Sequence, residues 1–154
     1  MFRKLVVLVF ILPFLLCGCG KSGAPSCDDG SVKDLVKQIV KEKIMWPYVL
    51  QMCAGDVVLH TTDKNVLLEY LKTAKDESEK ERIRRYIDCA EKELNETSLK
   101  LEGFITLTKD DTAKYSECKA VLTIESKDGR KASSNISYSA YYTSDGKLYV
   151  EVHQ

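Results

Sequence analysis

The chain has few of the residues that build catalytic and metal sites. It holds two histidines, His60 and His153, and it contains neither a CxxC pair nor a Cys-His cluster. A zinc site therefore lacks its usual ligand spacing. The signatures of serine hydrolases, zinc proteases, P-loop enzymes and dinucleotide-binding proteins are absent as well. We expect no catalytic residue, no metal site and no cofactor, and hence a protein that is not an enzyme.

The chain has no excess of positive or negative charge. Lys and Arg total 23 residues, and Asp and Glu also total 23. Nucleic-acid-binding domains carry a clustered basic face, whereas here the two signs are mixed, as on an ordinary solvated surface. We therefore expect no nucleic-acid partner.

A hydrophobic run long enough for a confident membrane span is missing too. The apolar run from Leu5 to Leu16 has about a dozen residues, and a spanning helix needs about 20. Pro13 lies within the run and weakens a continuous helix. Arg3 and Lys4 precede it, and this order of basic and apolar residues is typical of a secretory signal.

The end of this run, Leu16-Cys17-Gly18-Cys19, resembles the lipobox of bacterial lipoproteins. The resemblance implies cleavage after Gly18, a diacylglycerol on the Cys19 sulfur and acylation of the new amino terminus. Two alternatives stay open. Cys17 is a rival acceptor, although it would place the bulky Leu16 beside the cut, and the segment could also be an ordinary secretory signal.

The lipobox also sets the expected organisation of the chain. We expect a signal peptide over 1–18, a short flexible lipidated tether over 19–26 and a single α+β domain over 27–154. The lipid would hold this domain on the cell envelope. In a Gram-negative cell, Gly20 resembles the pattern sent to the outer membrane, with the domain facing the periplasm.

Four further cysteines agree with export, because exported domains commonly contain disulfides. Four cysteines allow three pairings. We favour a bond between Cys27 and Cys118 and another between Cys53 and Cys89. The first would join the helical half to the sheet, and the second would join two helices. In the alternative, one pair is reduced and buried.

The first half of the chain shows helical periodicity. A helix is expected from about Ser31 to Met45, with Pro47 preventing its continuation, and a loop or short strand is expected over 46–60. A second helix begins after Asp63. The charged stretch after Asp76 predicts the exposed face of a further helix, with a break near 73–77 and oppositely charged pairs at i,i+4.

The second half alternates with period two, which predicts strands with one face covered. The residues Leu99, Leu101, Gly103, Ile105 and Leu107 are expected to share one face of the first strand. Asp128-Gly129 and Asp145-Gly146 are hairpin signals. We therefore predict an α+β fold, with two to three helices packed on a four-stranded antiparallel sheet.

The strand sequence Cys118-x-Ala120-x-Leu122 and the final Asp145-Gly146-Lys-x-Tyr149-Val hairpin resemble those of small exported bacterial lipoproteins. The resemblance covers about 50 residues and carries no activity. The expected shape is similar to cystatin-like or NTF2-like rolls, in which helices pack on a curved sheet.

Four aromatic residues are candidates for a binding surface. Trp46 and Tyr48 would form an exposed contact patch, or else cap the core beside the first helix. Tyr141 and Tyr149 are expected on the polar side of the sheet, opposite Tyr138, as recognition residues or as a stabilising cross-strand pair.

These features predict a lipid-anchored envelope protein that binds another envelope macromolecule. Such a protein could be an inhibitor, an immunity or exclusion factor, or an assembly accessory. The alternative is a module that binds a small molecule or peptide in the concavity between sheet and helices.

Overall fold

The computed structural model describes residues 23–153, so the lipobox and Cys19 lie outside the described residues. Helices come first: α1 (Gly30–Ile39), the π-helical η1 (Val40–Met45), α2 (Trp46–Ala54), α3 (Lys64–Thr73) and α4 (Glu77–Asn95). The strands β1 (Ser98–Asp110), β2 (Tyr115–Glu125), β3 (Lys131–Tyr142) and β4 (Leu148–His153) follow. No helix within residues 23–153 is long and apolar enough to cross a membrane.

The four strands form one open antiparallel sheet in the order β1-β2-β3-β4. The α+β class and the four-stranded sheet predicted from the alternation are therefore confirmed. Both Asp-Gly pairs lie in the turns between strands, where Gly129 and Gly146 have φ of 81° and 79°. Glycine adopts this left-handed conformation without steric cost.

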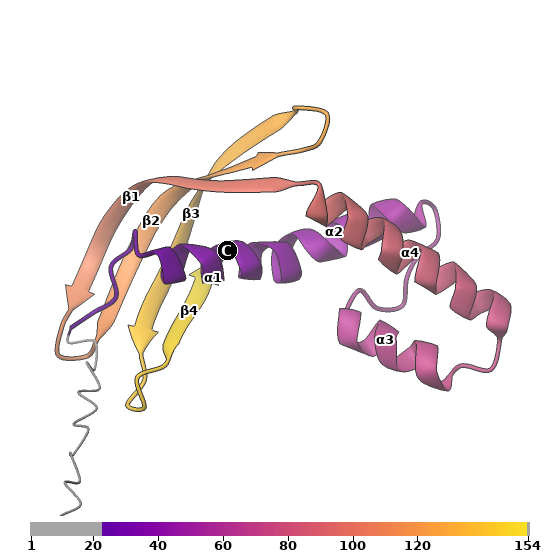
Figure 1. The fold of residues 1–154 in the computed structure, drawn as a ribbon, viewed down its shortest axis with the longest axis horizontal. Helices are drawn as coiled ribbons and strands as arrows, with labels where there is room; N and C mark the ends of the chain where they lie inside the picture. Colours follow the sequence, from indigo (N-terminus) through magenta and orange to yellow (C-terminus); the bar gives the residue numbers. More distant parts are fainter. Residues whose placement is uncertain (1–22, 154) are drawn as a thin grey trace, which may run out of the picture.

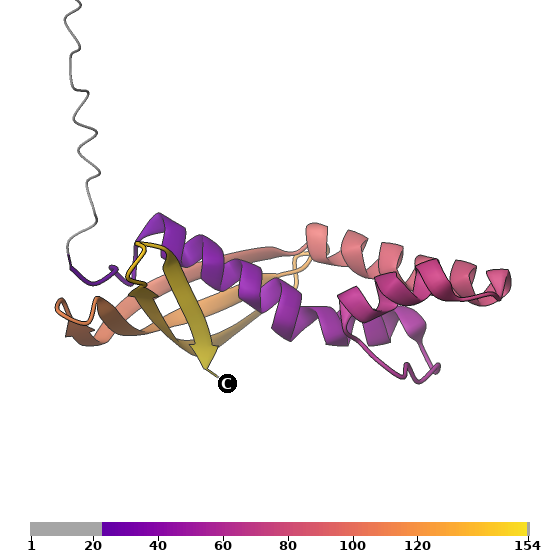
Figure 2. The same ribbon diagram turned by 90° about the horizontal axis from the view of Figure 1, so that it is seen from below.

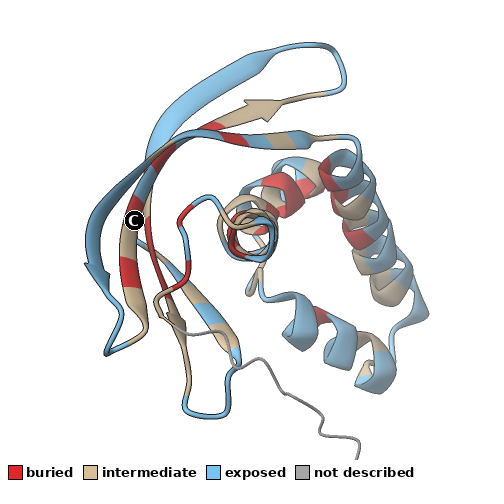
Figure 3. Ribbon diagram, turned by 60° about the vertical axis from the view of Figure 1, so that its left-hand side comes forward, coloured by how far each residue is buried: buried red, intermediate tan, exposed pale blue. Residues whose placement is uncertain are grey.

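The sheet curves around α1, as Figures 1 and 2 show. Val32, Val36 and Val40 recur along one side of the helix and are fully buried against the inner face of the sheet. Tyr138 and Cys118 contribute the facing side chains from β3 and β2. Figure 3, which views α1 nearly end-on, shows buried positions on the helix and on the strands around it. The concavity of the sheet is thus occupied by α1.

The expected loop over 46–60 is wrong for its first part, because α2 continues the helical path from Trp46 to Ala54. The Trp46 N–H bonds to the Lys41 carbonyl, five residues back, which closes the π-helical turn before Pro47. Pro47 then lies in the first turn of α2. Proline is tolerated in the first turn of a helix, because its fixed φ suits that position.

Helices α2, α3 and α4, here called the helical lobe, have a core of their own. Its buried residues are Trp46, Val49, Leu50, Leu67, Ile87, Ala90 and Leu94. Asp63 and Asp76 cap α3 and α4 by accepting hydrogen bonds from backbone N–H groups in the first turn. The break between the two helices falls where the sequence predicts it. In Figure 1 the lobe extends away from the sheet.

Both disulfides form with the expected pairing. Cys27 bonds to Cys118, which ties the segment before α1 to β2, and Cys53 bonds to Cys89, which ties α2 to α4. The two bonds therefore secure the two cores separately.

The alternation predicted for β1 is wrong beyond Gly103. The register shifts between Glu102 and Ile105, and Gly103 has a φ of 62°. A bulge of this kind moves the following side chains to the other face. Phe104 consequently packs towards the core, while Ile105 is 57% exposed.

The expected flexible tether is also wrong for its last residues. The Ala24 N–H bonds to Asp111 Oδ1 at 2.9 Å, and the Pro25 carbonyl accepts a buried hydrogen bond of 2.7 Å from Ser116 Oγ. Residues 23–26 are therefore held against the sheet beside the turn between β1 and β2.

Candidate functional site

Exposed apolar side chains concentrate on the helical lobe. Of the eleven large hydrophobic residues that are exposed within 23–153, seven lie on α2, on α3 or between them. Exposed apolar surface that is locally concentrated commonly marks an interaction site. The seven are Tyr48, Met52, Val57, Val58, Val66, Leu68 and Tyr70.

Tyr48 and Met52 form the most exposed part of α2. They are 74% and 70% exposed, and their i,i+4 spacing places them on one face of the helix. In the loop after α2, Val57 and Val58 are exposed as well. The Gln51 side chain donates hydrogen bonds to the carbonyls of Gly55 and Val57, at 3.2 and 3.0 Å, and so holds this loop to the end of α2.

Of the two roles that the sequence left open for Trp46, an exposed contact residue or a core residue, the structure shows the second. It is 4% exposed and belongs to the core of the lobe. Its indole N–H donates to the Thr62 carbonyl at 2.8 Å, and the Lys64 ammonium lies 5.0 Å from the ring centroid. Since α2 continues through Pro47, Trp46 and Tyr48 point to different sides of the helix, and only Tyr48 faces outward.

A groove of about 880 Å³ lies at the root of the lobe. Side chains from η1, the starts of α2 and α3 and the end of α4 surround it, including Lys43, Trp46, Lys64, Glu91 and Asn95. The lining carries both signs of charge together with amide groups. With Trp46, Pro47 and Leu94 also in the lining, the groove offers a ligand both polar and apolar contacts.

Two lysines of this groove are already paired. The Lys64 ammonium lies 2.6 Å from a carboxylate oxygen of Glu91, and Lys41 Nζ donates to the Leu94 carbonyl at 2.9 Å. The second contact places a cation at the carboxyl end of α4, where the helix dipole favours it. These bonds join η1 and α3 to α4 and shape the groove.

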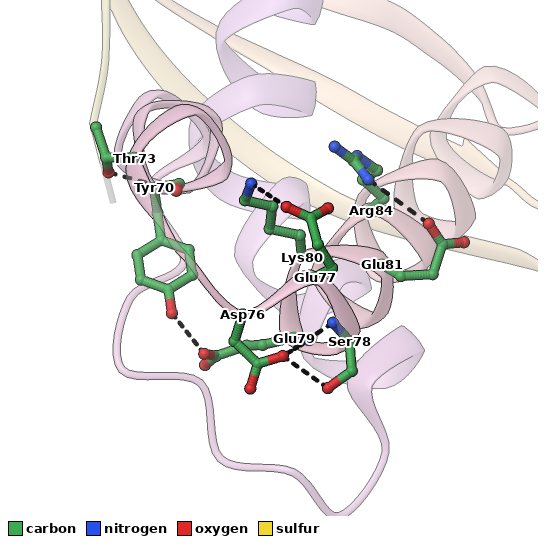
Figure 4. Close-up of polar contacts among 9 residues, drawn as sticks. All are labelled: Tyr70, Thr73, Asp76, Glu77, Ser78, Glu79, Lys80, Glu81 and Arg84. Carbon is green, nitrogen blue, oxygen red and sulfur yellow. Dashed lines mark hydrogen bonds and ion pairs between the residues drawn. The ribbon is translucent and has the colours of Figure 1, made fainter.

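The corner between α3 and α4 is held by polar contacts (Figure 4). The Tyr70 hydroxyl donates to Glu79 at 2.6 Å, and this bond, with the nearby negative charges, raises the pKa of Tyr70. The ion pairs along α4 have i,i+3 spacing, such as Glu77 with Lys80 at 2.6 Å, rather than the i,i+4 spacing expected. The expected ion pair between Asp76 and Lys80 does not form. The Asp76 carboxylate instead accepts hydrogen bonds from the backbone N–H groups of Ser78 and Glu79 and so caps α4.

Tyr141 and Tyr149 lie side by side on the outer face of the sheet. Their rings are stacked at 5.7 Å between centroids, and Tyr138, on the opposite face, is fully buried. Sequence reasoning missed Tyr115, which pairs with Tyr141 across β2 and β3. The period-two pattern together with the strand register could have found it.

The two histidines lie apart from these features. His60 is in the loop before α3, His153 ends β4, and both are exposed. Within residues 23–153, no group of three or more Cys, His, Asp or Glu side chains is arranged to hold a metal ion.

Comparisons of the chain with models of known protein families, with curated proteins and with solved structures find no match.

Proposed function

We propose that the protein is a lipid-anchored, non-enzymatic component of a bacterial cell envelope, and that its helical lobe binds another envelope protein. An inhibitor, an immunity or exclusion factor, or an assembly accessory would each act in this way. The observation that carries the proposal is the concentration of exposed apolar side chains on α2, α3 and the loop between them.

The chemistry of this surface favours a protein partner. Tyr48 and Met52 protrude from a helix whose other side is packed in a core and whose end is bonded to α4 through Cys53. Tyrosine and methionine are enriched in protein interfaces. Because the helix is rigid before binding, little conformational entropy is lost in the complex.

The position of the lobe also fits a tethered binding protein. The described chain begins beside the turn between β1 and β2, and α3 and α4 lie at the opposite end of the molecule in Figure 1. A lipid on Cys19 would therefore leave the lobe free to meet a partner.

Site-specific photo-crosslinking in the native cell tests this proposal. A photoreactive amino acid at position 52 should give a discrete crosslinked protein species. The same group at Arg85, an exposed position on α4, serves as the matched control. Equal crosslinking at the two positions, or none at position 52, would contradict binding through α2.

A second candidate is the binding of a small polar molecule or a peptide. The groove of about 880 Å³ beside Trp46 favours it. This groove lies among the helices rather than in the concavity of the sheet, which α1 fills. Native mass spectrometry of the purified protein should then show a bound ligand that a Lys43→Glu variant loses, and identical spectra without a ligand would contradict this candidate.

A further inference from the structure

A row of tyrosines crosses the sheet close to the point where the described chain begins. Tyr115, Tyr141 and Tyr149 are neighbours in the strand register, on β2, β3 and β4, and all three point to the outer face. We call them the tyrosine row. Tyr149 is 49% exposed, and the other two are half-buried.

The row lies at one end of the sheet, here called the tether end. Tyr115 directly follows the turn between β1 and β2, and Tyr141 and Tyr149 flank the turn between β3 and β4. Figure 1 shows both turns on the same side of the sheet. Gly23 belongs to this end as well, since its neighbour Ala24 is bonded to Asp111 in the turn between β1 and β2.

The distance from Gly23 to the lipid is short. Cys19 precedes Gly23 by four residues, and four fully extended residues span at most about 14 Å. Strand β3 has 12 residues, which at about 3.3 Å each extend about 40 Å. A lipid on Cys19 therefore brings the tether end, rather than the far end of the sheet or the helical lobe, to the bilayer.

We propose that the tether end of the sheet rests on the bilayer, with the tyrosine row in contact with the lipid headgroup region. This inference rests on the lipidation of Cys19 in the proposed function. Tyrosine suits that region because its ring is apolar and its hydroxyl can stay hydrated.

The charges at the tether end indicate which kind of membrane would be bound. Three lysines and three aspartates lie in or beside its two turns, and two ion pairs form among them, Lys109 with Asp111 and Lys147 with Asp145. Because no net positive charge results, the contact does not depend on anionic lipids. The six residues are Lys109, Lys114, Lys147, Asp110, Asp111 and Asp145.

Fluorescence quenching by brominated lipid tests the orientation. The full lipidated protein is reconstituted in neutral phosphatidylcholine vesicles whose acyl chains are brominated near the glycerol. Trp46, the single tryptophan of the chain, lies in the helical lobe and should keep its emission. In a Tyr149→Trp variant, most of the added emission should be lost, with the same result in anionic vesicles.

Ser133→Trp provides the matched control, because position 133 also lies on the outer face but near the far end of β3. The emission of the tryptophan added at position 133 should not be quenched by the brominated lipid. Tyr115→Trp repeats the test if the variant at 149 does not fold. Quenching that is equal at 149 and 133, or absent at 149 and 115, overturns the orientation.

Vesicle flotation separates this inference from the proposed anchor. A chain that does not float with the vesicles overturns both proposals. A chain that floats but shows no quenching at the tyrosine row overturns the orientation alone.

Discussion

Tyr138 shows how a single residue stabilises the core between α1 and the sheet. Its side chain is fully buried in β3, and its hydroxyl donates a hydrogen bond of 2.6 Å to the Cys27 carbonyl, just before α1. The alternation of β3 predicts that this residue faces inward. The partner of its hydroxyl could not be predicted, because the two residues are 111 positions apart and only the folded chain brings them together.

We predict that Tyr138→Phe lowers the free energy of unfolding by about 1–2 kcal/mol near neutral pH, because a buried hydrogen bond is lost without a change in shape. Chemical denaturation of the two proteins measures this difference. Equal stability would show that the bond contributes nothing.

The pH dependence of the same pair gives a second prediction. Burial, and to a smaller extent the charge of Asp28, raises the pKa of Tyr138 from 10.0 to about 12. Between these two values the unfolded chain loses a proton that the folded chain keeps, so the stability of the wild type falls as the pH rises. The advantage of the wild type over Tyr138→Phe should therefore shrink in alkaline denaturation series. An advantage that grows with pH would contradict the assignment.

Strand β1 shows what periodicity can and cannot predict for an element. The alternation identifies the strand correctly, but it predicts the same inward face on both sides of Gly103, whereas the register shifts there. The bulge there depends on pairing with β2, where Ile105 lies opposite Lys119, and pairing is not encoded locally. The single signal was a glycine within a strand pattern, which suggests a bulge.

Gly103→Ala should lower the free energy of unfolding by roughly 1–2 kcal/mol, because alanine disfavours the left-handed conformation found at this position. A built Cβ would meet Val121 at 3.7 Å, an ordinary contact, so the cost lies in the backbone. Gly30→Ala, in the first turn of α1 with open space around it, is the matched control and should change stability by about 0.5 kcal/mol or less. A neutral Gly103→Ala would argue against the bulge.

Helix α2 was missed for a related reason. A proline normally ends the helix that precedes it. Here the π-helical turn η1 comes before Pro47, and the proline lies in the first turn of a new helix, α2. The apolar residues after it, Val49 and Leu50, become core residues of the lobe only because α4 covers them.

The disulfide between Cys53 and Cys89 should stabilise the helical lobe more than the sheet. Replacing both cysteines by serine removes a crosslink over 36 residues and should cost about 2–4 kcal/mol. Hydrogen exchange should increase in α2 and α4, while β2 and β3 keep their protection because the bond between Cys27 and Cys118 remains. An equal increase throughout the chain would show that the two cores unfold as one.

On the scale of the whole molecule, the fold has two distinct ends. The sheet, α1 and the ordered residues 23–26 form the end that is nearest to Cys19 in the chain, and the helical lobe presents the exposed apolar surface at the other end (Figure 1). The sequence predicts the class of fold and that helices precede the strands, and the disulfide pairing that it favours is the one found. It does not predict that the lobe has its own core, because helical periodicity shows which face is buried but not what buries it.

The proposed lipid on Cys19 is tested by intact mass spectrometry of the protein isolated from its native membranes. We expect a lipidated chain that begins at Cys19 and gains two hydrogens for each of its two disulfides on reduction. A Cys19→Ala variant should keep its fold and both disulfides but leave the membrane. An unlipidated mature chain, or continued membrane retention of Cys19→Ala, would contradict lipid anchoring at Cys19.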